Sequence, residues 1–520
     1  MSSSSFYRKL WASIHKREIY IVAFLVAAIS IMSAPLLNPD GLEMAQVGQC
    51  ILGLLPIELG GCDAWQPLYY PPAFPLLSGL LSWVFGVGGL FILSLMAAGM
   101  LVRPLSRLVE GLSGHKNVTA VLAVTLLSIS SYSFYGMLAE PRMLFVFALF
   151  SVWSMMLKSE GQRPSRQPLF AIGVLSASLM LIRPEGILVG PLLVCYAFWR
   201  LGRRGWRVAA GLLVVALPWW GLLSANSGRL TVSSRSWELA GVSMLSYLPV
   251  RPLVQLWGVG ASERPMREAL SGLGPSQFSG ESGLFDSLLS VFSSLAGNLP
   301  APLLVLAIIG IYLSLRSSDH RHISVAMGLV VIPSFALSMT PVGRDVAMPL
   351  NNLLPVVFVL VVYGVVGMYW LSTVIRRRMQ VSNRAAQLTL LSSIIVGGLF
   401  TPYPNSQLYW PQSSESGLMA ASWINENTDQ SETVASTFAT SPIAHLSQRP
   451  WRALPSRWDG GSWSSEEAPS WFVVSAVDGT WPINSPMFRR EMNIEPRAIF
   501  SDDDGWALVL ERTASISIRP

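Results

Sequence analysis

Charged residues are scarce in this sequence, at 13% of 520 residues, whereas hydrophobic residues make up 51%. The mean hydropathy is +0.47. Soluble globular proteins carry about 25% charged residues, and a soluble domain of this length could not bury so much apolar surface. The composition therefore excludes an ordinary water-soluble protein and predicts a chain that lies in a bilayer.

Several motifs of well-known enzyme classes are also missing. The sequence has no P-loop, no G-x-G-x-x-G after a strand, no G-x-S-x-G and no cysteine and histidine spacing of the zinc type. The net charge of +6 does not indicate nucleic acid, because many of the basic residues fall in short loops between apolar segments. These residues report orientation in a membrane.

Cysteine is rare, with three in the chain. Cys50 and Cys62 fall in one predicted outer loop, where an oxidising compartment could join them in a disulfide. Their pairing is left open at this point. Cys195 lies in an apolar segment and is expected to serve membrane packing.

Long apolar segments recur from Ile19 to Phe400, and the clearer ones approach the roughly 20 residues that cross a bilayer. A stretch at 67–85 is interrupted by prolines and predicts a short helix in the outer interface. The remaining segments predict a mainly α, polytopic transmembrane bundle of about eleven spans. These spans are expected at 19–37, 88–102, 118–136, 143–157, 169–182, 186–199, 208–224, 298–315, 323–339, 350–371 and 385–400.

The basic residues orient this bundle. Every predicted inner loop carries lysine or arginine, as the positive-inside rule requires, whereas the first outer loop at 38–87 has none. The N-terminus is therefore expected in the cytoplasm of a multi-pass plasma or inner membrane protein. The inner basic residues are Arg103, Arg107, Lys116, Lys158, Arg163, Arg166, Arg200, Arg203, Arg204, Arg207, Arg316, Arg321, Arg376, Arg377, Arg378 and Arg384.

From Thr401 onward the composition becomes that of a soluble domain. Residues 416–426 have helical spacing, and 433–436, 471–474 and 507–510 are typical of strands. The sequence thus predicts a transmembrane domain at 1–400 and a small α/β extracytoplasmic domain at 401–520.

Two acids follow the first predicted span. Asp40 comes directly after it and Glu43 three residues later, on the same face if a helix starts at Asp40. Such a pair suits binding of a hydroxyl or a metal ion. Alternatively, Asp40 caps an interfacial helix by satisfying its free amides.

A second outer boundary reads Glu140-Pro141-Arg142. A carboxylate at the membrane boundary is costly unless it is paired or functional, so Glu140 is a candidate site residue. The alternative is an ion pair with Arg142 or a helix cap. Either role is compatible with a functional one.

Further outer boundaries contain Arg183 with Glu185, and Arg344 with Asp345. An arginine there suits a phosphate diester, because its planar fork offers parallel donors and stays charged. Pairing with the neighbouring acid, or snorkelling, is the alternative.

Tyr69 and Tyr70 stand with prolines at the entrance to the interfacial helix, where aromatic rings anchor at headgroup depth. Taken together and in this order, the segments resemble the GT-C superfamily of integral membrane glycosyltransferases, in particular its protein mannosyltransferase and aminoarabinose-transferase branch. Asp40, Glu140 and the Pro/Tyr-rich interfacial segment carry the resemblance, with the segments that begin at Arg183 and Arg344. The common second acid beside the first is replaced by Gly41, which leaves the role of Glu43 in doubt.

The resemblance implies a GT-C fold and an inverting transfer of a sugar from a polyprenyl phosphate to a glycan, lipid or protein acceptor on the outer face. Asp40 would be the base or would orient the acceptor hydroxyl, and Glu140 would assist it. Arg344 would hold the donor phosphate with Arg183, and Tyr69, Tyr70 and Glu185 would contact substrate.

Some relatives hold a divalent metal through an acid and a histidine, but this chain has no histidine in its outer membrane-adjacent loops. No cofactor is therefore assigned, and a divalent ion stays an open alternative. Two other classes also remain open: a transporter or flippase for a lipid-linked or anionic solute, and a non-catalytic factor for glycan assembly.

Overall fold

The structure is a computed structural model. It describes residues 36–37, 39–54, 71–86, 88–116, 118–138, 140–160, 166–183, 185–227, 284–318, 320–338, 349–401, 410–411, 415–429, 431–436, 443, 447, 449, 451–453, 470–475, 494–502 and 505–512.

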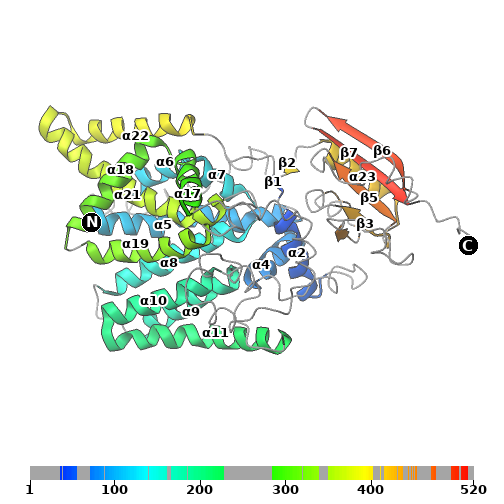
Figure 1. Ribbon diagram of the computed structural model, residues 1–520, viewed down its shortest axis with the longest axis horizontal. Coiled ribbons are helices and arrows are strands. Elements are labelled where there is room, and N and C mark those ends of the chain that lie inside the picture. The colour runs from blue at the N-terminus through cyan, green and yellow to red at the C-terminus, as the bar shows by residue number, and fades with distance from the viewer. Residues whose placement is uncertain are drawn as a thin grey trace, which may run out of the picture.

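Apolar helices form a bundle, and a β-sheet stands beyond one end of it (Figure 1). A helix occurs at the position of every predicted span that lies within the described residues. The helices of the bundle are α5 (Gly88–Ser113), α6 (Thr119–Leu127), α7 (Ser130–Met137), α8 (Pro141–Glu160), α9 (Arg166–Ile182), α10 (Gly186–Leu201), α11 (Trp206–Ser227), α17 (Leu284–Asn298), α18 (Ala301–Arg316), α19 (Arg321–Ser338), α21 (Pro349–Met379) and α22 (Asn383–Leu399).

In the part of the chain that the structure describes, fewer helices are long enough to span a membrane than the sequence predicted. Among the described residues four stretches are long and apolar enough to cross, and up to six if each of two bent pairs is one span. The four are Gly88–Ser113, Pro141–Ser159, Gly186–Ala225 and Leu353–Met379. The count of about eleven thus remains a prediction, and the architecture is a multi-pass helical bundle.

Three predicted segments differ in detail from the structure. The expected span at 118–136 is two helices, α6 and α7, bent by 85° at Ser128 and Ile129. The expected inner loop after residue 102 is helical, since α5 continues to Ser113. Leu36 and Leu37, the last two residues of the expected first span, form strand β1, which pairs with β2 (Trp410–Pro411), and the rest of that span lies outside the described residues.

Helix α21 occupies the centre of the bundle. In its most apolar stretch of 18 residues, 89% of the residues are buried. Phe358 packs edge to face against Tyr132 and Phe150. Its neighbour α18 approaches closely through glycines, since a Cβ added to Gly367 would lie 2.0 Å from the Leu306 carbonyl oxygen. Small residues at such contacts let membrane helices pack by van der Waals attraction.

Two short helices cover the sheet-facing end of the bundle. Helix α4 (Ala73–Phe85) is the predicted interfacial helix, and its 13 residues span about 20 Å, too little to cross the hydrocarbon. Helix α2 (Pro39–Ile51) packs against it. A Cβ added to Gly48 would lie 1.8 Å from the Pro75 carbonyl oxygen, so this glycine permits the close contact.

The C-terminal residues form a five-stranded sheet. Its order is β4 (Trp451–Ala453), β3 (Val434–Ser436), β5 (Trp471–Ser475), β7 (Gly505–Arg512) and β6 (Ile494–Asp502). Strand β3 is parallel to β4 and β5, whereas β7 is antiparallel to β5 and β6. Helix α23 (Glu415–Asn427) packs on one face through Ile424. All four elements predicted here have counterparts in the structure; the division into domains at residue 400 stays a prediction.

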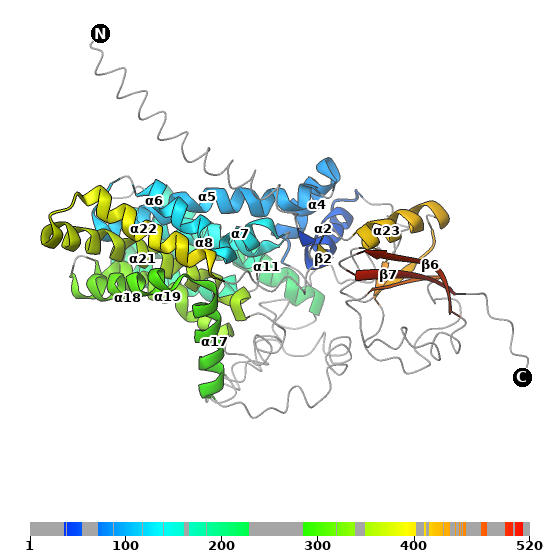
Figure 2. The ribbon, with the colours of Figure 1, turned by 90° about the horizontal axis from the view of Figure 1, so that it is seen from above.

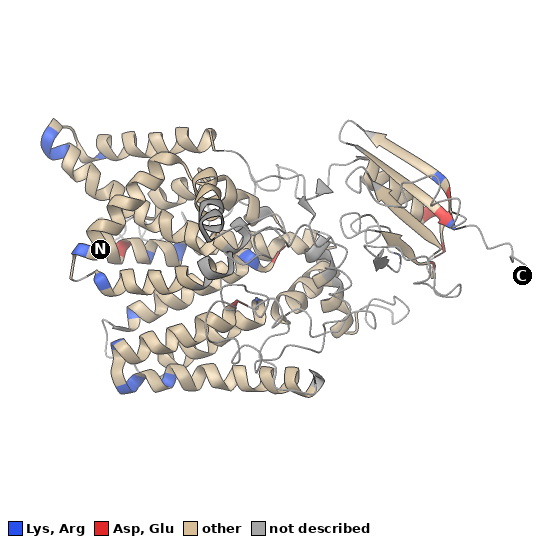
Figure 3. Ribbon diagram, viewed as in Figure 1, with Lys and Arg blue, Asp and Glu red and all other residues tan. Residues whose placement is uncertain are grey.

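Charge divides the two ends of the bundle. Figure 3 shows lysine and arginine gathered at the end remote from the sheet, over the ends of α10, α18, α21 and α22. From above, α17 projects out of the bundle (Figure 2), in keeping with the 113° bend between α17 and α18. The basic end and the sheet-facing end are therefore opposite ends of the same bundle.

Candidate active site

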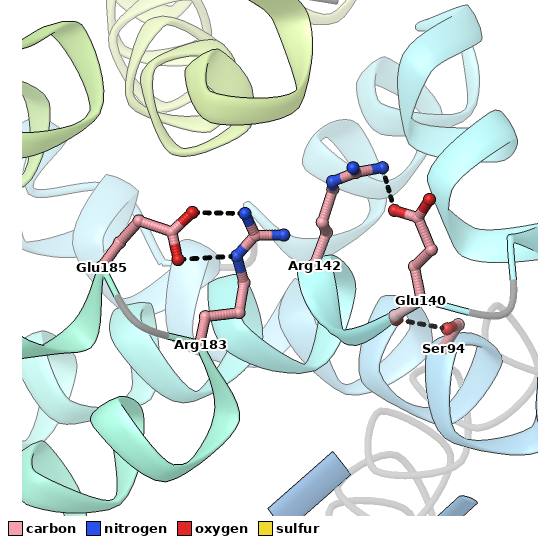
Figure 4. Close-up of polar contacts among 5 residues, drawn as sticks. All are labelled: Ser94, Glu140, Arg142, Arg183 and Glu185. Atoms are coloured by element: carbon pink, nitrogen blue, oxygen red, sulfur yellow. Dashed lines mark hydrogen bonds and ion pairs between the residues drawn. The ribbon is translucent and has the colours of Figure 1, made fainter. Parts of the chain in front are cut away.

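Glu140 lies at the sheet-facing end, directly before α8 begins at Pro141. Its backbone amide donates to the Leu138 carbonyl at 2.8 Å, and its carbonyl accepts from Ser94 Oγ of α5 at 3.0 Å (Figure 4). The Glu140 residue is 3% exposed. The hydrogen bond from Ser94 to the Glu140 carbonyl fixes the backbone position from which the carboxylate extends.

The Glu140 carboxylate forms an ion pair with the Arg142 guanidinium. Arg142 also lies over the ring of Tyr135, with Cζ 5.7 Å from the ring centroid. A cation in the first turn of a helix faces the positive end of the helix dipole, which disfavours it. Glu140 and the Tyr135 ring together offset that cost.

Arg142 still has unused hydrogen-bonding capacity. Its Nε is buried and makes no hydrogen bond to any residue in the described part of the chain. An arginine has five N–H donors, and a buried donor without an acceptor carries a desolvation cost. Arg142 is therefore suited to an anionic ligand.

A second ion pair joins Arg183 and Glu185 between α9 and α10. Arg183 Nε donates to Glu185 Oε2 at 3.0 Å, and a second nitrogen contacts Oε1, so the pair is bidentate. Arginine follows the C-terminus of α9 and glutamate precedes the N-terminus of α10, so both charges suit the helix dipoles. This is the pairing that the sequence left open as the alternative for Arg183.

The two ion pairs lie at the same end of the bundle. Helix α8 packs against both α5 and α9, and the close-up shows the two guanidinium groups between the two carboxylates in that view (Figure 4). Two ion pairs thus lie where the sequence predicted outer ends. Arg142, which sequence reasoning treated only as a partner of Glu140, belongs to this group; its signal was a cation in the first turn of a helix.

Helix α2 reaches the same region. Its Met44 and Val47 cluster with Phe74 of α4, and Leu93 of α5 and Leu144 of α8 pack against them. Leu93 precedes Ser94, and Leu144 lies one turn after Glu140. Asp40 is in the first turn of α2, one helical turn before Met44. The backbone of the predicted base is therefore on a helix that packs at the Glu140 site.

The other predicted residues can be placed only in part. The backbone of Asp40 and of Glu43 is described as helical, but their side chains lie outside the description. Cys50 takes part in a disulfide, as the sequence allowed, and Cys195 is a free thiol. Tyr69, Tyr70, Cys62 and Arg344 lie outside the described residues.

Among the residues whose side chains are described, no three histidine, cysteine, aspartate or glutamate side chains form a group that could hold a metal ion. At Glu140 a guanidinium already contacts the carboxylate. The described side chains therefore do not fit a metal.

Comparison with solved structures identifies the fold. The chain is similar to ArnT from Cupriavidus metallidurans bound to undecaprenyl phosphate, with TM-score 0.60, 14% identity, and 98% of this chain and 99% of ArnT covered. The apo state of the same ArnT gives TM-score 0.54 at 13% identity, with both chains fully covered. No protein-family model matches the sequence, and no curated protein matches it.

An archaeal protein shares the same architecture. The oligosaccharyltransferase of Archaeoglobus fulgidus, in complex with zinc and sulfate, gives TM-score 0.55 at 13% identity. The match covers 93% of this chain and 72% of the oligosaccharyltransferase. Both neighbours are GT-C glycosyltransferases, so the GT-C fold that the sequence predicted is confirmed.

Proposed function

We propose that the chain is an integral membrane glycosyltransferase that moves a sugar from a polyprenyl-phosphate donor to an acceptor hydroxyl at the outer membrane face. One observation carries the proposal. The ion pairs Glu140–Arg142 and Arg183–Glu185 both lie at the end of the bundle that α2 covers, and this end is opposite the basic one. The fold is that of a protein whose structure holds undecaprenyl phosphate.

The proposed reaction is a single displacement. Asp40 takes the proton of the acceptor hydroxyl as its oxygen attacks the anomeric carbon of the sugar. The bond between that carbon and the phosphate oxygen breaks, and the polyprenyl phosphate leaves with the electron pair. Attack opposite the leaving group inverts the anomeric carbon.

The arginines stabilise the charge that develops on the phosphate. Arg142 contributes its free Nε, while Glu140 and Ser94 hold it in place. Arg183 adds positive charge from a position that Glu185 fixes, and Arg344 is the third proposed phosphate ligand. Tyr69, Tyr70 and Glu185 remain the proposed contacts to substrate and Glu43 a proposed catalytic acid, as the sequence predicted.

The charge asymmetry supports an orientation as well. With the basic end in the cytoplasm, the proposed site and the sheet lie outside an inner or plasma membrane. A donor anchored by its lipid tail then presents its sugar phosphate at the interface where Glu140 and α2 lie.

Reconstitution tests the reaction. Wild-type protein should consume one member of a panel of polyprenyl-phosphate sugars when acceptor is supplied, and mass spectrometry should detect the glycosylated acceptor. Asp40→Asn should abolish transfer at unchanged abundance in the membrane. Glu110→Gln is the matched control, because this carboxylate lies near the basic end of α5, and it should retain transfer.

Two outcomes would reject the proposal. Normal transfer by Asp40→Asn would remove the proposed base. Movement of an intact labelled donor across the bilayer, without cleavage of its sugar–phosphate bond, would instead identify a flippase.

A further inference from the structure

A cavity of about 250 Å³ lies at the basic end of the bundle, far from the Glu140 site. It is formed by the C-terminal ends of α5, α18 and α21 together with the residues before α19. Its lining consists of Leu112, Ser113, His115, Leu313, Ser314, Ser317, His320, Val366, Tyr369, Trp370 and Thr373. More than half of these side chains carry a polar atom, although the surrounding helices are largely apolar.

The Ser314 hydroxyl is a buried polar group that the protein does not satisfy. Ser314 is 2% exposed, and its Oγ makes no hydrogen bond to any residue that the structure describes. Most buried serines of this bundle bond to a carbonyl of their own helix, as Ser106 does to Val102. Because Ser314 lines the cavity, a ligand there can supply the missing acceptor or donor.

Two imidazoles are held in fixed positions at the same cavity. His320 Nδ1 lies 2.9 Å from the Leu112 carbonyl oxygen and must donate to it, because a carbonyl only accepts. Nε2 of His320 is then the nitrogen that faces a ligand. His115 stacks on Tyr369, with ring centroids 4.8 Å apart.

Cations neighbour the lining residues along the chain. Lys116 and Arg321 directly follow the two histidines, and Arg316, whose Nη1 donates to Tyr312 Oη at 3.2 Å, lies between Ser314 and Ser317. Arg376 and Arg377 follow Thr373 by three and four residues, so they lie one turn further along α21. All five are exposed. The acids nearest along the chain are Glu110 on α5 and Asp319, directly before His320, and the five cations outnumber them.

We propose that this cavity binds the phosphate of an anionic membrane lipid from the leaflet at the basic end. Basic pockets between membrane helices on the cytoplasmic side suit such headgroups. The volume lies below the roughly 300–1,000 Å³ of a drug-sized ligand site, so it fits one small phosphate-bearing headgroup. Ser314 donates to the phosphate and the neighbouring exposed cations attract it, while the acyl chains run along the exposed apolar surface of α18, which includes Ile308 and Tyr312.

Native mass spectrometry of the full chain in detergent tests this site. Phosphatidylglycerol should be retained by the wild type, and zwitterionic phosphatidylcholine should not. Ser314→Ala and Arg316→Gln should each weaken phosphatidylglycerol binding about tenfold, as expected for a lost hydrogen bond to a charged group. Neither change should impair folding, because the Ser314 hydroxyl bonds to none of the described residues and Arg316 is exposed.

Arg203→Gln is the matched control. Arg203 is exposed at the same end of the bundle, in the 3-10 helix η1 (Gly202–Gly205), and it does not line the cavity. Its removal should leave lipid retention unchanged. Equal loss in Arg203→Gln and Ser314→Ala would show diffuse attraction to the surface and overturn the proposal.

Competition with inorganic phosphate distinguishes a lipid headgroup from free phosphate as the ligand of the cavity. If millimolar phosphate displaces the lipid, the headgroup phosphate occupies the cavity, and the proposal is supported. Binding of inorganic phosphate with no retention of phosphatidylglycerol would overturn the lipid assignment. Equal retention of phosphatidylcholine would overturn the anion assignment.

Discussion

The Arg142 guanidinium pairs with the carboxylate of Glu140, two residues earlier in the chain, at the first turn of α8. The pair is buried, and Ser94 of α5 holds its backbone. Glu140 and Arg142 therefore form a local ion pair at the start of α8, and the neighbouring helix α5 positions it.

Removing one partner of this unit should destabilise the protein. Glu140→Gln leaves a buried, unpaired arginine, which costs about 3–5 kcal/mol. Thermal unfolding in detergent should show a lowered Tm. The double variant Glu140→Gln, Arg142→Met should recover most of the stability, because it leaves no uncompensated charge. We expect the double variant to remain inactive in transfer, and recovery of both stability and activity would contradict a functional role for Arg142.

The two arginines should differ in their effect on the donor. Arg142→Lys keeps the charge but removes the free Nε donor, so the KM for the polyprenyl-phosphate sugar should rise about tenfold or more. Arg183→Lys breaks a bidentate contact within the protein and should mainly lower the Tm. Steady-state kinetics on both variants, beside their unfolding curves, checks this. Equal KM increases would show that both arginines contact the donor alike.

The sequence alone could predict the helices and the charged residues at their outer ends because each rests on local chemistry. Apolar length locates α5, α8 and α21, and proline at 71, 72 and 75 predicts the short helix α4. A charge at the end of an apolar segment is costly enough to need a partner, which indicated Glu140 and Arg183.

Other features depend on contacts between distant segments. The 85° bend between α6 and α7 occurs where a Cβ on Gly398 of α22 would lie 2.2 Å from the Ser128 carbonyl oxygen, a contact that no local pattern encodes. The pairing of Leu36–Leu37 with Trp410–Pro411 joins residues far apart in the chain. Ser94 was missed for the same reason, since its partner is 46 residues away.

The contact between α2 and α4 should control activity through the position of α2. Gly48→Ala places a Cβ 1.8 Å from the Pro75 carbonyl oxygen, so the helices must separate, at a cost of about 1–3 kcal/mol. Asp40 on α2 would move with its helix, and transfer should fall while the protein still folds. Gly88→Ala is the control, because a Cβ there meets nothing within 4 Å. If Gly48→Ala kept wild-type kcat, the packing of α2 on α4 would not position the base.

Cysteine labelling tests the orientation of the bundle. In a Cys195→Ser background, Cys50 is disulfide-bonded and should not react. Glu426→Cys introduces an exposed thiol on α23, and Arg203→Cys introduces one at the basic end. A membrane-impermeant maleimide should label Glu426→Cys in intact cells, and Arg203→Cys only after permeabilisation, because arginine and lysine mark the cytoplasmic side. The reverse pattern would place the Glu140 site at the cytoplasmic face, where a donor presented outside could not reach it.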